Sequence, residues 1–75
     1  MSAVVRRSLA DDLAASVLEL IADQQLAAGD QLESVRSLAE RFQVAVPTMR
    51  ESLRRLEAIG AVELRHGSGV YVAPN

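Results

Sequence analysis

The apolar residues in the first third of the chain recur every three or four positions. They are Leu9, Leu13, Val17, Leu20 and Ile21, and acidic side chains occupy the opposite face. Ser8 is a favoured N-cap residue, and Asp11, three positions later, completes a capping box. The pattern predicts an amphipathic helix that starts at Leu9 and buries one face in a core. Gly29 and Asp30 then form a turn signal, and residues 30–32 can make an isolated edge strand at most.

Two more amphipathic segments follow, separated by a short connection. Ser34 can cap a second, two-turn helix whose apolar positions run from Val35 to Phe42. Residues 43–45 make a tight connection, and Pro47 opens a third helix because the missing N–H of proline has no partner in the first turn. Gly60 is expected to close this helix in a left-handed conformation, giving it the bounds 46–60. Its apolar stripe comprises Val46, Met49, Leu53, Leu56 and Ile59.

Beyond Gly60 the apolar spacing changes from helical to alternating. Val62 and Leu64 alternate with charged residues, residues 66–69 supply turn chemistry, and residues 70–72 favour a returning strand. Three helices followed by a hairpin is the order of a winged helix-turn-helix, a mainly α fold with a small β-hairpin. Residues 1–75 are therefore expected to form one domain. Its predicted core contains Leu13, Val17, Leu20, Leu38, Phe42, Met49, Leu53, Leu56 and Ile59.

Composition narrows the classes of function. With 75 residues the chain suits one small domain and is too short for an elaborate enzyme. The absence of Cys excludes a disulfide framework and a thiolate metal site, and favours a cytoplasmic protein. A single His leaves no second imidazole for a His-based metal site, and the acidic pairs lie on a polar helix face with nothing to raise a pKa, so we expect no enzyme activity and no cofactor. One Phe and one Tyr offer little to stack on single-stranded bases, and no apolar run is long enough to span a membrane.

The two halves of the chain differ in charge. The net charge is -2 overall, but residues 1–33 hold two Arg against six acidic residues, whereas residues 34–75 hold six Arg against four Glu. The second half is therefore the candidate surface for a polyanion. All eight basic residues are Arg, which suits bidentate contacts with phosphate and guanine, although a compositional bias toward Arg would give the same count.

A combination of short motifs runs through most of the chain. It comprises Gly29-Asp30-Gln31-Leu32, Ser34, Arg36, Leu38-Ala39-Glu40, Val44, Pro47-Thr48, residues 50–57, Gly60, Val62-Glu63 and the tip Gly67-Ser68-Gly69. Together these residues resemble the DNA-binding domain of GntR-family transcription regulators. The stretch RESLRRLEAIGAVELRHGSGVYV, residues 50–72, is most similar to the FadR-type branch, whose members carry a helical C-terminal effector domain that binds a small organic acid.

The resemblance implies sequence-specific binding of double-stranded DNA, with helix 46–60 in the major groove and wing 65–70 at the flanking groove. A full-length protein would then be a homodimer on a short inverted repeat, with a small-molecule effector bound only by a further domain. The residues expected to contact DNA lie at the start of the second helix, along the third helix or at the wing tip. They are Arg36, Val46, Pro47, Thr48, Arg50, Arg54, His66 and Gly67. For Arg55 we expect ordinary ion pairing instead.

Two departures from the family pattern affect these expectations. Similar proteins open the recognition helix with Ser-Arg, whereas this chain has Ala45-Val46, which lacks a capping hydroxyl and a guanidinium. Val46 cannot pair with guanine but could pack on a thymine methyl, so a preference for A·T is expected there. The second helix lacks the usual capping-box Glu, since Ser37 stands in its place, and its start is expected to be weaker.

Other functions remain open at this stage. A winged helix can serve as a protein assembly module, with its Arg-rich face meeting an acidic partner, and the mild charge of residues 34–75 is compatible with that use. A domain of this kind can also be fused to an effector domain that resembles a pyridoxal-phosphate enzyme. The residues after Asn75 would distinguish such a fusion from a FadR-type protein.

Overall fold

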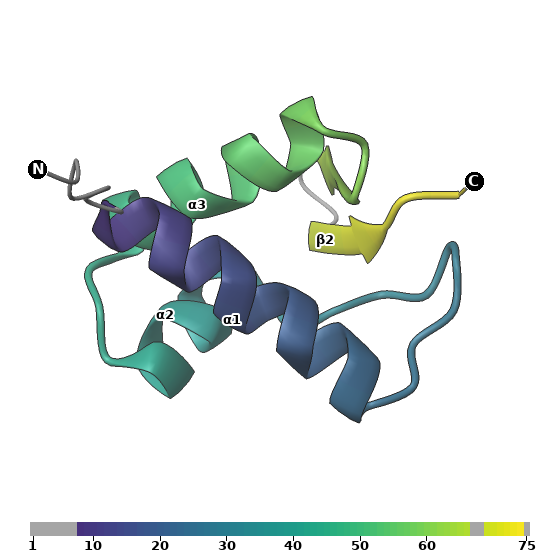
Figure 1. Ribbon diagram of the computed structural model, residues 1–75, viewed down its shortest axis with the longest axis horizontal. Helices are drawn as coiled ribbons and strands as arrows, with labels where there is room; N and C mark the ends of the chain where they lie inside the picture. The colour runs from purple at the N-terminus through teal and green to yellow at the C-terminus, as the bar shows by residue number, and fades with distance from the viewer. Residues whose placement is uncertain (1–7, 67–68, 75) are drawn as a thin grey trace, which may run out of the picture.

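The computed structural model describes residues 8–66 and 69–74, which form three helices and a two-stranded hairpin (Figure 1). The helices are α1 (Leu9–Asp23), α2 (Val35–Phe42) and α3 (Val46–Ala58). The antiparallel strands are β1 (Val62–Arg65) and β2 (Gly69–Val72), with Leu64 opposite Val70 in the register. This architecture confirms the predicted winged helix-turn-helix.

Local signals explain where the helices begin. The Oγ atom of Ser8 accepts a hydrogen bond of 3.1 Å from the Asp11 N–H, and that of Ser34 accepts one of 3.1 Å from the Ser37 N–H. The start of α2 has additional support, because Glu33 accepts a hydrogen bond of 2.7 Å from the Ser37 hydroxyl and also pairs with the Arg41 guanidinium. Glu33 thus ties the N-cap region of α2 to its last turn, an anchor that the sequence motif did not reveal.

The third helix ends earlier than the predicted bounds 46–60. Its last helical residue is Ala58, Ile59 is the C-cap, and Gly60 follows at φ +79°, the left-handed conformation expected of it. Because Ile59 lies beyond the last regular turn, it leaves the apolar stripe, and its side chain is 73% exposed. The prediction that Ile59 belongs to the core is therefore wrong.

The core lies where the three helices meet the hairpin. Of the predicted core residues, Leu13, Val17, Leu38, Met49, Leu53 and Leu56 are buried, whereas Leu20 and Phe42 are only half-buried and pack against its edge. Leu32, Val62 and Val70 complete the core from the loop and the strands. The hydroxyl of Ser52, also buried, donates to the Met49 carbonyl at 2.9 Å, which satisfies its polar atom.

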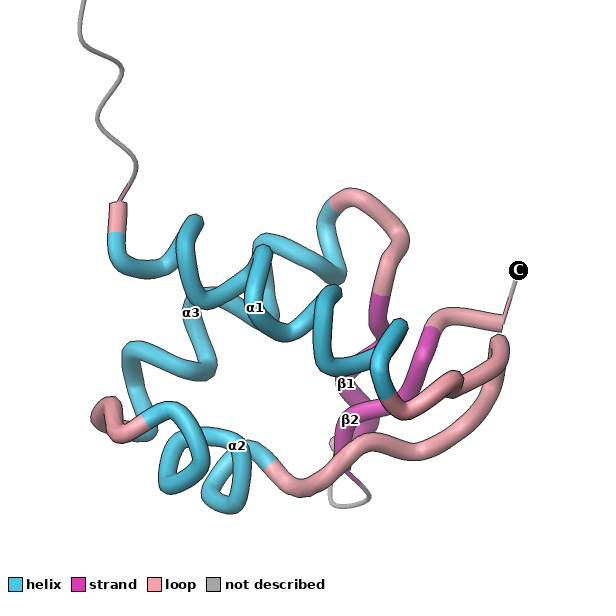
Figure 2. Tube along the Cα trace, turned by 60° about the horizontal axis from the view of Figure 1, so that its bottom comes forward, coloured by secondary structure: helices cyan, strands magenta, loops and turns pink. Residues whose placement is uncertain are grey.

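The loop between α1 and α2 adds a third segment to the hairpin. The Leu32 N–H donates to the Val70 carbonyl at 2.8 Å, and the Val72 N–H donates to the Asp30 carbonyl at 2.8 Å. Residues 30–32 therefore pair with β2 through one isolated β-bridge, between Gln31 and Tyr71, and do not form a strand. Figure 2 shows this loop and both strands gathered on one side of the helices. Gly69 sits at φ +123°, and a Cβ atom there would lie 3.0 Å from the Gln31 amide nitrogen. The positive φ explains why glycine is favoured at this position, because other residues rarely adopt it.

No helix in the described part of the chain is long and apolar enough to cross a membrane.

Candidate nucleic-acid interface

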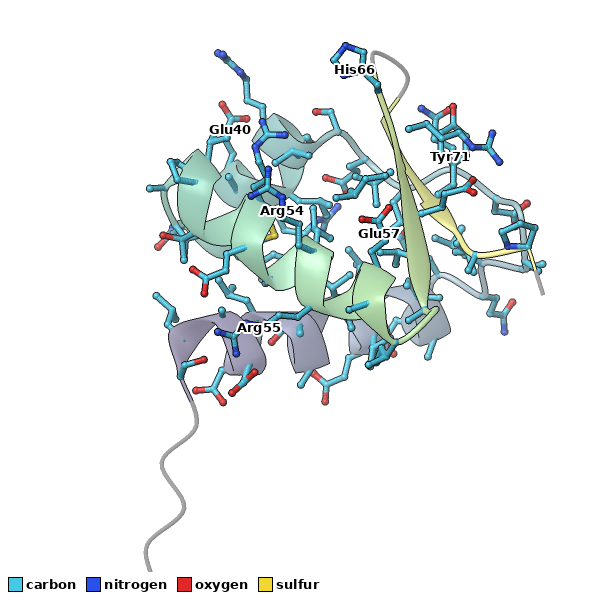
Figure 3. The ribbon with its side chains drawn as sticks, turned by 90° about the horizontal axis from the view of Figure 1, so that it is seen from above. Glu40, Arg54, Arg55, Glu57, His66 and Tyr71 are labelled. Atoms are coloured by element: carbon cyan, nitrogen blue, oxygen red, sulfur yellow. The ribbon has the colours of Figure 1, made fainter. Side chains whose placement is uncertain are left out.

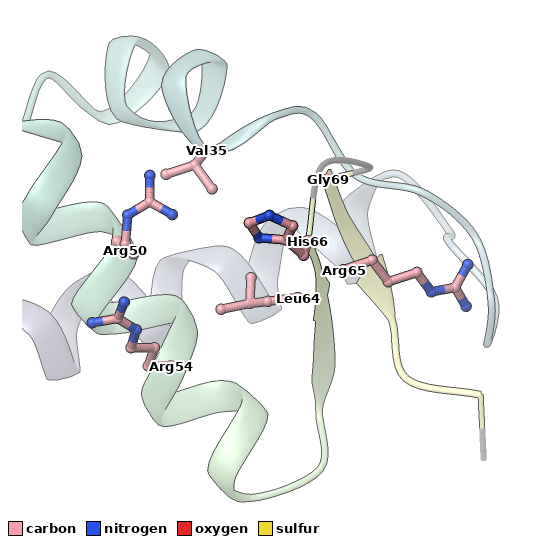
Figure 4. Close-up of a pocket in the computed structure, with 7 residues that line it drawn as sticks. All are labelled: Val35, Arg50, Arg54, Leu64, Arg65, His66 and Gly69. Carbon is pink, nitrogen blue, oxygen red and sulfur yellow. The ribbon is translucent and has the colours of Figure 1, made fainter.

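A cleft of about 350 Å³ separates α3 from the hairpin. Arg50 and Arg54 line the cleft from α3 (Figure 4). Leu64 lines it from β1, His66 from the position directly after β1, and Val35 from the start of α2. Arg50 and Arg54 occupy neighbouring positions on one helix face because they are four residues apart. Two guanidinium groups and an imidazole therefore border the same cleft.

The six Arg residues of the second half divide into two groups. Arg41 pairs with Glu33, Arg55 with Asp11 and Glu51, and Arg65 with Glu63. Arg36, Arg50 and Arg54 are exposed, and among residues 8–66 and 69–74 none of them forms a hydrogen bond or an ion pair. These three are the ones expected from the family resemblance to contact DNA. Their charge is available to a ligand, whereas the charge of the paired group is largely compensated.

Arg54 and Arg55 are adjacent in sequence but lie on different faces of α3, because successive helical residues are rotated by about 100°. Figure 3 shows Arg54 on the side of His66 and Arg55 on the side of α1. Arg55 donates to the Asp11 carboxylate at 2.6 Å and to the Glu51 carboxylate at 2.9 Å. The expected ion pairing of Arg55 is thus confirmed, and its partner on α1 joins two helices that are remote in sequence.

The Arg55 ion pair makes stability depend on pH. Hydrogen bonding from the Arg55 guanidinium, with help from Ser8, lowers the pKa of Asp11 in the folded protein. A lowered folded pKa stabilises the fold above the pKa of the unfolded chain, and this contribution is lost as the pH falls below about 4. We expect Asp11→Asn to lose less unfolding free energy than the wild type between pH 6 and pH 3, as measured by denaturant titration. The same pH dependence in both proteins would contradict this role.

The start of α3 has an uncapped N-terminus. Ala45 is the N-cap, and no side chain accepts a hydrogen bond from the first-turn N–H groups. These groups carry the positive end of the helix dipole, which favours an anion such as phosphate. Thr48 is half-buried in this turn and Pro47 is exposed. Val46 is half-buried and packs against the core, so its side chain contributes to folding as well as to the helix entrance.

The remaining expected contacts lie at the ends of their elements. Arg36 is exposed in the first turn of α2, and His66 is exposed directly after β1. Gly67 lies outside the described residues. Arg65, next to His66, also lines the cleft, but its guanidinium group points to the outer side of the hairpin (Figure 4), where the guanidinium carbon lies 3.9 Å from the Tyr71 ring centroid. That cation–π contact and the Glu63 pair hold Arg65 on the outer face of the hairpin.

Sequence reasoning missed Val35 and Leu64 as residues of the cleft. Both occupy apolar positions of regular patterns and were therefore interpreted only as packing residues. No pattern along the chain indicates that the second helix and the first strand approach the same side of α3. Within the residues that the structure describes, no group of three His, Cys, Asp or Glu side chains could hold a metal ion.

Comparison with known proteins places these features in a family. The family model for bacterial regulatory proteins of the gntR family matches residues 9–72. The transcriptional regulator LutR of Bacillus subtilis is 45% identical over 53 residues, which are 71% of this chain and 24% of that relative. The repressor NanR of an Enterobacter species is 34% identical over 93% of this chain and 27% of its own length. The chain spans about a quarter of the length of these curated relatives.

Solved structures agree with the sequence comparison. YydK of Bacillus subtilis, described as a possible transcriptional regulator, superposes with a TM-score of 0.84 at 32% identity, over 88% of this chain and 29% of that structure. BusR of Streptococcus agalactiae, in complex with its busAB-promotor DNA, superposes with a TM-score of 0.78 at 29% identity, over 91% of this chain and 33% of that structure. With a family match over most of its length and the same fold as these regulators, the chain belongs to the gntR family of bacterial regulatory proteins.

Proposed function

We propose that this domain binds double-stranded DNA in a sequence-specific manner, as part of a transcription regulator. The observation that carries the proposal is the cleft, where Arg50 and Arg54 border a common space with His66 and have no acidic partner among the described residues. The DNA complex of BusR, which shares the fold at 29% identity, favours DNA over an acidic protein surface as the ligand of this face.

The arrangement suggests how DNA would be contacted. The first turns of α3 enter the major groove, which is about 12 Å wide and accommodates a helix. Arg50 and Thr48 then face base edges or phosphates, and Arg54 follows one turn later along the same groove. His66 lies across the cleft from them and reaches the flanking backbone with the wing. Arg36 contacts a phosphate from the start of α2, while Val46 and Pro47 approach the bases by apolar contact.

We also propose what kind of protein contains this domain. We infer that the domain belongs to a longer, cytoplasmic regulator with no enzymatic activity of its own, because curated relatives are about three times as long and are transcriptional regulators. The similarity of residues 50–72 supports the FadR-type branch, with an effector domain that follows this one. Such a protein would bind as a homodimer, each copy placing one α3 helix in a half-site of an inverted repeat.

A salt-titrated binding assay against a randomised duplex library tests this function. The isolated domain should bind in about the micromolar range or more weakly at physiological salt, because few phosphates are neutralised by one copy. Affinity for DNA should fall as the salt concentration increases, and selection should enrich a short half-site. A protein that carries two copies of the domain should require two such half-sites arranged as an inverted repeat. Affinity that is independent of salt, or no enrichment at all, would contradict DNA binding and favour the protein assembly function.

A further inference from the structure

The first strand of the wing is held to α3 by a carboxylate. The Glu57 Oε2 atom, in the last turn of α3, accepts a hydrogen bond of 3.0 Å from the Leu64 backbone N–H. Figure 3 shows Glu57 between α3 and β1. The two residues are seven positions apart and belong to different elements, so this contact fixes the hairpin relative to the helix.

The register of the sheet explains why this N–H is available. Leu64 lies opposite Val70, whose carbonyl accepts from the Leu32 N–H on the far edge of β2. Successive residues of an antiparallel strand direct their main-chain groups to opposite sides. Leu64 and Val70 are thus a pair without mutual hydrogen bonds, and the Leu64 N–H points away from β2 toward α3. Without Glu57 this donor would be left to solvent.

The hydrogen bond between Glu57 and Leu64 lies next to the cleft. The Leu64 side chain lines the cleft with Arg50 and Arg54, and His66 follows two residues later, directly after the end of β1. A shift of β1 relative to α3 would therefore move His66 relative to both guanidinium groups. We propose that Glu57 is a positioning residue that sets the wing against the recognition helix and thereby determines DNA affinity. This inference rests on the proposed function of the cleft.

The charge of Glu57 makes the proposal sharply testable. A carboxylate near DNA repels phosphate, so its removal alone should strengthen binding. If Glu57 positions the wing, removal of the acceptor should instead weaken binding. Glu57→Gln keeps an acceptor oxygen on a side chain of the same length but removes the charge, whereas Glu57→Ala removes both. The two variants therefore separate the effect of removing the charge from the effect of removing the hydrogen-bond acceptor.

Binding of one selected duplex should be measured for both variants at one salt concentration. We expect Glu57→Gln to bind as tightly as the wild type or more tightly, and Glu57→Ala to bind about fivefold more weakly than Glu57→Gln, the effect of one lost hydrogen bond. Hydrogen exchange of the Leu64 amide should accelerate in Glu57→Ala, while that of the core amide of Leu53 should change little. Equal affinities of the two variants, or unchanged exchange at Leu64, would overturn the proposal.

Combination with a second substitution shows whether Glu57 acts through the wing. The loss of DNA affinity caused by Glu57→Ala should be smaller in a His66→Ala background, because the side chain that Glu57 positions is then absent. The same loss of affinity should persist in an Arg36→Ala background. The same loss in both backgrounds would refute action through the wing. A different result would contradict the proposed DNA-binding function itself: unchanged DNA binding by the Arg50→Ala and Arg54→Ala variants. The exchange measurement at Leu64 needs no DNA and stands in either case.

Discussion

Replacement of Leu53 with alanine should destabilise the domain by about 2–5 kcal/mol, the range observed when a buried leucine is truncated and a cavity remains. Leu53 is fully buried in α3, within the core shared by all three helices and the hairpin. In a domain of this size each kcal/mol lowers the thermal midpoint by about 4–8 °C. Thermal or chemical denaturation followed by circular dichroism measures the change.

Ile59→Ala is the matched control for this experiment. It removes an apolar side chain of the same size from the C-cap position of the same helix, but Ile59 is 73% exposed. We expect a change of no more than about 0.5 kcal/mol, as for most surface substitutions. A Leu53→Ala variant with the midpoint of the wild type would show that the stripe of α3 does not form the core. A large effect of Ile59→Ala would show that this side chain is covered in solution.

Replacement of Arg50 and Arg54 with alanine should weaken DNA binding strongly. Each substitution by alanine should cost about 1–3 kcal/mol of binding free energy if the side chain contacts a base, and a phosphate contact should lower the salt slope by about 1. The double variant should accordingly lose at least about 2 kcal/mol while the fold is unchanged, because neither side chain has a partner in the described structure. Fluorescence anisotropy over a range of salt concentrations separates base contacts from phosphate contacts.

Arg55→Ala is the control for charge. It removes one positive charge from the residue next to Arg54, but this guanidinium faces α1 and is engaged by Asp11 and Glu51. We expect a small change in affinity and an unchanged salt slope. If Arg54→Ala and Arg55→Ala weakened binding equally, the effect would come from net charge, and the cleft would not be the site of contact.

Interactions between near neighbours in the chain explain why much of this fold could be predicted. Ser8 and Ser34 cap the helices as their positions indicated, and Gly60 adopts the left-handed conformation that ends α3. The change from helical to alternating spacing correctly located the hairpin. Each of these features depends on groups within a few residues of one another, so a linear pattern contains the necessary information.

Tertiary packing decided the features that join distant parts of the chain. Arg55 meets Asp11 across 44 positions, which directs it away from the cleft and leaves that face to Arg54. The Glu57 contact with Leu64, and the pairing of residues 30–32 with β2, likewise depend on how elements are oriented after folding. The chain alone therefore determined the elements, their order and the family motifs. Which arginines remain free, and how wide the cleft is, follow only from the packing of helices and hairpin, because helical spacing does not specify which neighbour each face will meet.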